Sequence, residues 1–115
     1  MFSSVHSMAL HGLEVCEVSV EADIADGGLP VFEMVGFLGS EVKESKNRIR
    51  TALRNSGFFL PPKRITVNLS PADMRKTGSH FDLPVAVSLL MSMGIITEEA
   101  DNTVFAGELS LSGSV

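Results

Sequence analysis

The chain has 115 residues, of which 44% are hydrophobic and 20% are charged, a composition typical of one globular domain that buries a core. Its single cysteine, Cys16, excludes an internal disulfide and a multi-cysteine metal site, and it favours a reducing, cytoplasmic location. No run approaches the ~20 apolar residues of a membrane span, and the first residues lack the features of a signal peptide. We therefore expect no membrane partner.

Charge is segregated along the sequence. All nine lysine and arginine residues lie between Lys43 and Lys76, in a segment with only two acidic residues, while both flanking segments are acidic. The formal net charge of -5 hides this basic block. Such a block suits a phosphate backbone or an acidic neighbouring subunit. The alternative is an ordinary solvated helix face.

The first third of the chain has the alternating pattern of strands. Apolar and polar residues alternate over 13–25, and the phase slips near Cys16, which indicates a β-bulge. Residues 31–36 form a short apolar strand that closes on a glycine, after turn-forming residues at 26–30. We expect three strands before the first helix.

A helical period begins at residue 40, with apolar residues on one face and basic residues on another. We expect Ser40 to cap this helix, Glu44 to pair with Arg48, and Gly57 to follow its last turn. Two prolines then break the chain, and the alternation over 65–70 predicts another strand.

Residues 81–94 are apolar nearly all round, which predicts a central helix covering the sheet. Pro84 falls in its first turn and Gly94 ends it. Residues 103–115 return to a strand pattern before a turn at Ser112 and Gly113. The chain stops just past this turn, which would leave a hairpin without its second arm, so we expect a fragment of a longer protein.

Several apparent motifs carry no chemistry. Residues 40–43 match S-x-x-K and residues 76–78 match K-T-G, but the serine enzymes with these motifs are larger and place K-T-G on a strand. No G-x-x-x-x-G-K-[ST] loop is present, so we expect these residues not to bind ATP. His6, His11 and His80 lack the spacing of metal ligands, so we expect no metal site.

Four segments in fixed order carry a family resemblance: VKES at 42–45, PPKRITVNL at 61–69, PAD at 71–73 and FDLP at 81–84. Over essentially its whole length the chain resembles the N-terminal domain of the magnesium-chelatase-like AAA+ ATPases, the ComM/YifB family. The resemblance implies that residues 1–115 form a single Lon-like domain of a longer AAA+ ATPase. It also implies an α+β fold, in which a mixed β-sheet is covered by two main helices as in the Lon proteolytic domain.

The resemblance also bears on the turn Gly78-Ser79-His80. In Lon-type proteases the corresponding turn carries the nucleophile in a G-P-S-A-G context, and a lysine beyond a G-E strand activates it. Matched from Gly78, the nucleophile position falls on His80, with Ser79 one residue early, and no lysine follows Lys76. The resemblance therefore implies a degenerate nucleophile turn and no catalytic residue.

As to function, the resemblance implies a non-catalytic accessory domain of a ring-forming, ATP-driven motor. The motor would be a bacterial DNA helicase or branch-migration enzyme that acts in natural transformation and DNA recombination. ATP and Mg²⁺ are expected at an ATPase module outside these residues, and no cofactor within them. Two alternatives stay open, namely a Lon-type serine protease domain with an incomplete Ser-Lys site and a subunit of a magnesium-chelatase-type complex.

The expected partners are the rest of its own chain, neighbouring subunits of a ring, and DNA. The residues predicted to contact DNA or a subunit are Lys43, Lys46, Arg50, Arg54, Lys63, Arg64, Arg75 and Lys76. Tryptophan and tyrosine are absent and we expect no aromatic residue among the charges, so DNA contacts would be to phosphates. The alternative partners of the block are the acidic strands of a neighbouring subunit, through Glu17, Glu21 and Asp23.

Overall fold

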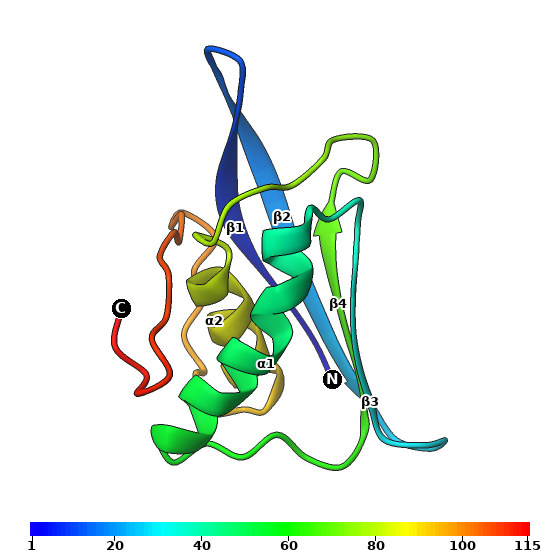
Figure 1. Ribbon diagram of the computed structural model, residues 1–115. Helices are drawn as coiled ribbons and strands as arrows, with labels where there is room; N and C mark the ends of the chain where they lie inside the picture. The colour runs from blue at the N-terminus through cyan, green and yellow to red at the C-terminus, as the bar shows by residue number, and fades with distance from the viewer.

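A mixed four-stranded β-sheet with two helices on one face makes up the protein, and the computed structural model describes all residues from 1 to 115 (Figure 1). The elements in chain order are β1 (Phe2–His11), β2 (Glu14–Ala25), β3 (Val31–Val35), α1 (Ser40–Asn55), β4 (Arg64–Ser70) and α2 (Asp82–Ser92). The sheet order is β1-β2-β4-β3, with β3 and β4 parallel and the other pairs antiparallel. This arrangement confirms the predicted α+β fold and the three strands before the first helix.

Strands β1 and β2 form a long hairpin whose tip projects beyond the rest of the sheet (Figure 1). Residues 2–11 pair with residues 14–23 without interruption, so the β-bulge predicted near Cys16 is wrong. The alternation is lost there because Glu14 and Val15, next to the tip, are both exposed to solvent. Because both faces of the projecting hairpin tip contact solvent, neither face needs to be apolar.

The two faces of the sheet differ in chemistry. The face toward the helices is apolar and contributes half of the core, through Val5, Ala9, Val18, Val20, Ala22, Ile24, Phe32, Ile65, Val67 and Leu69. The alternate positions of β2 and β3 point the other way and place Glu17, Glu21, Asp23 and Glu33 on the outward face. Four of the fourteen acidic residues therefore lie on the side of the sheet that the helices leave open.

Helix α1 connects the parallel strands β3 and β4 and buries one apolar stripe. It begins at Ser40 with Gly39 in the capping position and no side-chain cap, so the predicted Ser40 cap is wrong by one residue. Gly57 follows the helix with φ +91°, as predicted. Helix α2 packs on β1 and β2, with Pro84 in its first turn, which confirms the predicted central helix. Neither helix has the length and apolar content to cross a lipid bilayer.

Residues 103–111 form no strand, contrary to the prediction. The segment is extended and crosses the start of α2, where the carbonyl of Gly107 accepts a hydrogen bond from the N–H of Leu83 at 2.9 Å. The N–H of Gly107 donates to the carbonyl of His80 at 2.9 Å. Both backbone groups of Gly107 are thus bound at the start of α2, and only one isolated bridge, between Val104 and His6, joins the segment to β1. The turn predicted near the end of the chain is present at Gly113, with φ +94°.

The connection from β3 to α1 turns sharply at Gly36. Its φ is +119°, and a Cβ at this position would overlap the carbonyl oxygen of Leu69 in β4. The carbonyl of Gly36 also accepts a hydrogen bond from Lys76 Nζ at 2.7 Å. Only glycine allows the backbone to approach β4 this closely.

We expect Gly36→Ala to lower the free energy of unfolding by more than the ~1–2 kcal/mol that left-handed backbone strain alone costs. The matched control is Gly57→Ala, where φ is also positive but a Cβ meets no other atom. Urea unfolding followed by circular dichroism measures both changes. Equal destabilisation by the two variants would contradict the close approach at Gly36.

Candidate functional site

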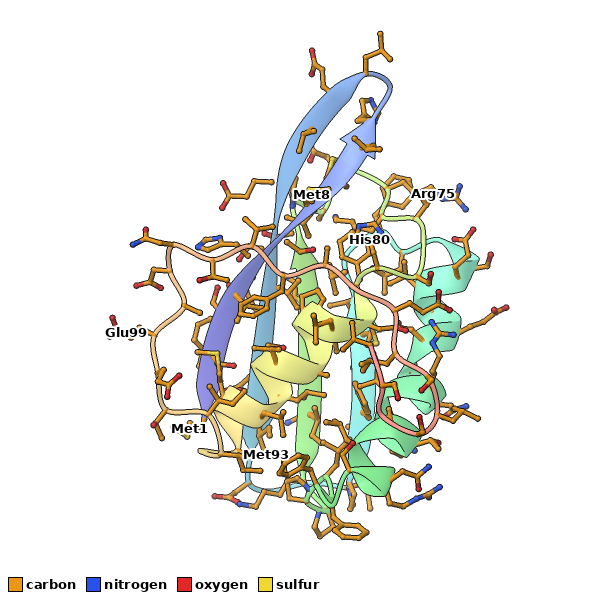
Figure 2. All side chains as sticks on the ribbon, turned by 90° about the vertical axis from the view of Figure 1, so that its left-hand side faces the viewer. Met1, Met8, Arg75, His80, Met93 and Glu99 are labelled. Carbon is orange, nitrogen blue, oxygen red and sulfur yellow. The ribbon has the colours of Figure 1, made fainter.

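In the turn at residues 78–80, the hydrogen bonds of Ser79 and His80 provide no base that could activate the Ser79 hydroxyl. Ser79 Oγ donates to the carboxylate of Glu108 at 3.1 Å, and His80 Nε2 donates to the carbonyl of Met8 at 2.7 Å. Figure 2 shows His80 on the side of the hairpin that carries Met8. A serine nucleophile is activated by a histidine or an amine, and a carboxylate is a much weaker base. In addition, no three His, Cys, Asp or Glu side chains lie close enough to hold a metal ion.

Lys76 is the lysine nearest to Ser79 in the sequence, and its side chain is fully buried. Its Nζ donates to the carbonyl oxygens of Gly36 and Pro71, so it joins the loop before α1 to the loop after β4. Burial lowers the pKa of this amine, a property that catalytic lysines share. Its hydrogen-bond partners are backbone carbonyls and not the Ser79 hydroxyl. The prediction that Lys76 contacts DNA or a subunit is therefore wrong, because a buried amine is inaccessible to either.

Arg48 of α1 and Asp82, the first residue of α2, form a bidentate ion pair. Nε of Arg48 lies 2.7 Å from Oδ2 of Asp82, and Nη2 lies 2.9 Å from Oδ1. The N–H of Leu109 donates to the same carboxylate at 3.0 Å. The hydrogen bond to Asp82 raises the pKa of Arg48 above its usual value. The predicted pair of Arg48 with Glu44 is wrong, because Arg48 forms its ion pair with Asp82 and none with Glu44.

The remaining predicted contact residues do not form one continuous surface. Lys43, Arg50 and Arg54 are exposed along α1, and Lys63 and Arg64 are exposed at the start of β4. Lys46 is half-buried and its Nζ donates to the carbonyl of Phe32 at 3.2 Å. Arg75 lies near His80, at the opposite end of the molecule from Met93 (Figure 2).

Three of these cations do line one groove, which we call the α1 groove. Arg50, Arg54 and Lys63 contribute to a hollow of about 300 Å³ between α1 and the loop of residues 59–63. The other lining residues are Pro30, Val31, Phe32, Phe59, Leu60, Pro61, Pro62 and Ile65. The Arg50 guanidinium lies 5.5 Å from the centre of the Phe32 ring, within the range of a cation–π interaction. Sequence alone does not place α1 beside this loop.

Phe59 is a candidate site residue that the sequence reasoning missed. It lines the α1 groove and is 69% exposed. The prediction that no aromatic residue lies among the charges is therefore wrong. The signal was present, because Phe58 and Phe59 stand between Arg54 and Lys63 in the sequence.

Comparisons with known proteins place this geometry in a family context. Residues 20–115 match the family model ChlI, described as subunit ChlI of Mg-chelatase. The uncharacterized protein YifB of Escherichia coli is 41% identical over 114 residues, which are 98% of this chain and 22% of YifB. The competence protein ComM of Haemophilus influenzae is 39% identical over 112 residues, 96% of this chain and 22% of ComM. The chain thus spans about a fifth of the length of these relatives.

We expect Arg48→Met to lower the free energy of unfolding by about 3–5 kcal/mol, because it leaves the buried Asp82 carboxylate without a counter-charge. The double variant Arg48→Met, Asp82→Leu should recover part of this loss, since it removes both charges. Urea unfolding of the four members of this cycle gives the coupling energy.

The control is Asp26→Asn, which breaks the exposed pair between Asp26 and Lys63, 3.0 Å apart. This change should cost no more than about 1 kcal/mol. If Arg48→Met proves as mild as Asp26→Asn, the buried pair does not stabilise the fold as described.

Proposed function

Because the chain belongs to the family of the Mg-chelatase subunit ChlI and matches YifB and ComM at 41% and 39% identity, we propose that it is a non-catalytic accessory domain of a ComM-like AAA+ ATPase. The predicted resemblance to this family is confirmed. We further propose that the domain has the Lon-like fold, works in the cytoplasm, and packs against the rest of its chain and neighbouring subunits of a ring. The whole protein would be an ATP-driven motor that processes DNA.

ATP and Mg²⁺ would then act at another module of the motor. The described residues do not fit either group, because no cluster of His, Cys, Asp or Glu could hold a metal ion and no G-x-x-x-x-G-K-[ST] loop is present. What this domain contributes is its surface. ComM is named a competence protein, and the proposed DNA is accordingly that taken up and recombined in natural transformation.

The observation that most supports a DNA contact is the convergence of three cations in one groove. Arg50, Arg54 and Lys63 line the α1 groove, and no aspartate or glutamate is among its lining residues. Lysine and arginine that converge on one surface of an acidic protein suit phosphates, which carry most of the affinity in non-specific DNA binding. Without base-edge contacts such binding does not depend on sequence.

A second candidate is a Lon-type serine protease domain, favoured by one observation. The pKa of Lys76 is lowered by burial, and this lysine stands three residues before Ser79. Against it, the amine is bound by two carbonyls and the Ser79 hydroxyl by Glu108. A chelatase-type subunit has only the description of the family model in its favour.

We expect no reaction of Ser79 with a fluorophosphonate probe, because no base lies in position to take its proton. Intact-mass spectrometry after incubation measures the labelling, and casein or fluorogenic peptides report hydrolysis. Stoichiometric labelling that disappears in Ser79→Ala and in Lys76→Met would establish the protease alternative instead.

We expect the double variant Arg50→Glu, Arg54→Glu to bind DNA at least tenfold more weakly than the unchanged chain, whose dissociation constant should fall near the ~10⁻⁴ to 10⁻⁶ M of non-specific binding. The slope of log affinity against log salt should fall by about 2, one for each lost phosphate contact. Fluorescence anisotropy with labelled single- and double-stranded DNA at low and moderate salt measures both effects.

The matched control is Lys43→Glu, Arg75→Glu, which changes the net charge equally but lies outside the α1 groove. It should retain most of the affinity. Equal losses in both double variants, or no binding by any protein, would reject the groove as a DNA contact and favour subunit packing.

A further inference from the structure

The α1 groove combines cations with an uncovered aromatic ring. Phe59, Pro61 and Lys63 line both this groove and an adjoining hollow of about 440 Å³ that Met1 and Met93 also line. The Phe59 ring therefore stands between two hollows. Phe59 is 69% exposed, so its ring is accessible for stacking on another planar group.

The loop that carries Phe59 is anchored at both ends. The N–H of Phe58 donates to the carbonyl of Leu53 at 2.8 Å, which attaches the start of the loop to α1. The carbonyl of Lys63 accepts from the N–H of Val31 at 3.3 Å, which attaches its end to β3. Pro61 and Pro62 restrict the backbone between these points. The ring is thus presented before any ligand arrives, which lowers the entropy that binding would lose.

The cations are arranged along the same groove. Arg50 and Arg54 are one helical turn apart, a spacing of about 5–6 Å between Cβ atoms. The groove has no acidic residue in its lining, although Lys63 also pairs with the exposed carboxylate of Asp26 at 3.0 Å. A negatively charged chain can therefore follow the two arginines without meeting a like charge, and at Lys63 it would compete with Asp26.

We propose that the α1 groove binds single-stranded DNA, with phosphates on Arg50, Arg54 and Lys63 and one unpaired base stacked on Phe59. In a duplex the faces of the bases are covered by their neighbours, so a ring beside the backbone has nothing to stack on. A positively charged groove with an aromatic platform is the general means of binding single strands without sequence preference. This inference rests on the proposed function and adds the form of DNA and the stacking residue.

The chain lacks tryptophan and tyrosine, so Phe59→Trp places a single tryptophan in the groove. We expect (dT)20 to quench its emission in a saturable, salt-dependent way, and the duplex (dA)20·(dT)20 to leave it nearly unchanged. The matched control is Leu111→Trp, at a residue that is 57% exposed and outside the groove. Its emission should respond to neither DNA.

Affinity gives an independent measurement. Phe59→Ala should weaken binding of (dT)20 by about 5- to 150-fold, the range that loss of one stacked base produces. Binding of the duplex should change less than twofold, because only phosphates are contacted there. Circular dichroism melting checks that the variant keeps its fold, as expected for so exposed a side chain.

The outcomes separate this inference from the function on which it rests. If Phe59→Ala weakens neither DNA, or weakens both equally, or if Phe59→Trp is not quenched by (dT)20, the base platform is rejected. Duplex binding that still depends on Arg50 and Arg54 would leave the proposed function standing in each of these cases. If the unchanged chain binds neither (dT)20 nor the duplex at low salt, both are rejected.

Discussion

The buried ion pair between Arg48 and Asp82 orients the helical layer of this protein. Two unlike charges taken out of water stabilise a fold only if their geometry is good and their remaining hydrogen-bonding capacity is used. Here the carboxylate accepts two bonds from Arg48 and one from the N–H of Leu109, so it joins α1, α2 and the last segment of the chain. Arg50 lies about 200° around the helix from Arg48, so it points away from the ion pair and lines the α1 groove.

Sequence reasoning succeeded for elements whose pattern reflects their own burial. Helix α1 was predicted because its buried stripe repeats with helical spacing, and α2 because it is covered on nearly every side. It failed where distant partners decide the structure. Residues 103–111 alternate like a strand, yet the backbone of Gly107 binds the start of α2 and the N–H of Phe105 binds β1. Alternation alone does not predict this docking. Lys76 looked like a surface residue because nothing local shows that its amine binds the carbonyl of Gly36, 40 residues earlier, as well as that of Pro71 in its own loop.

At the candidate site too, the sequence predicted the local pattern but not the contacts between distant residues. Counting charges located the basic block, but only the folded chain separates Arg50, Arg54 and Lys63, which share a groove, from Arg75 at the other end of the molecule. The FDLP segment helped to identify the family, although the sequence did not show what its aspartate, Asp82, does. The structure gives Asp82 a role, through a partner 34 residues away. A pattern can thus mark a residue long before the contact that explains it is known.

The segment that crosses α2 has a further effect on the sheet. Where it passes β1, the N–H of Phe105 donates to the carbonyl of His6, and Ser7 Oγ donates to the carbonyl of Phe105. Part of the edge strand β1 is therefore already covered, while the other edge strand, β3, has only five residues. Exposed edge strands can pair with strands of other molecules and cause aggregation, and proteins usually protect them by covering or shortening them. The segment that failed to become a strand thus blocks the addition of another strand near His6, over part of the β1 edge.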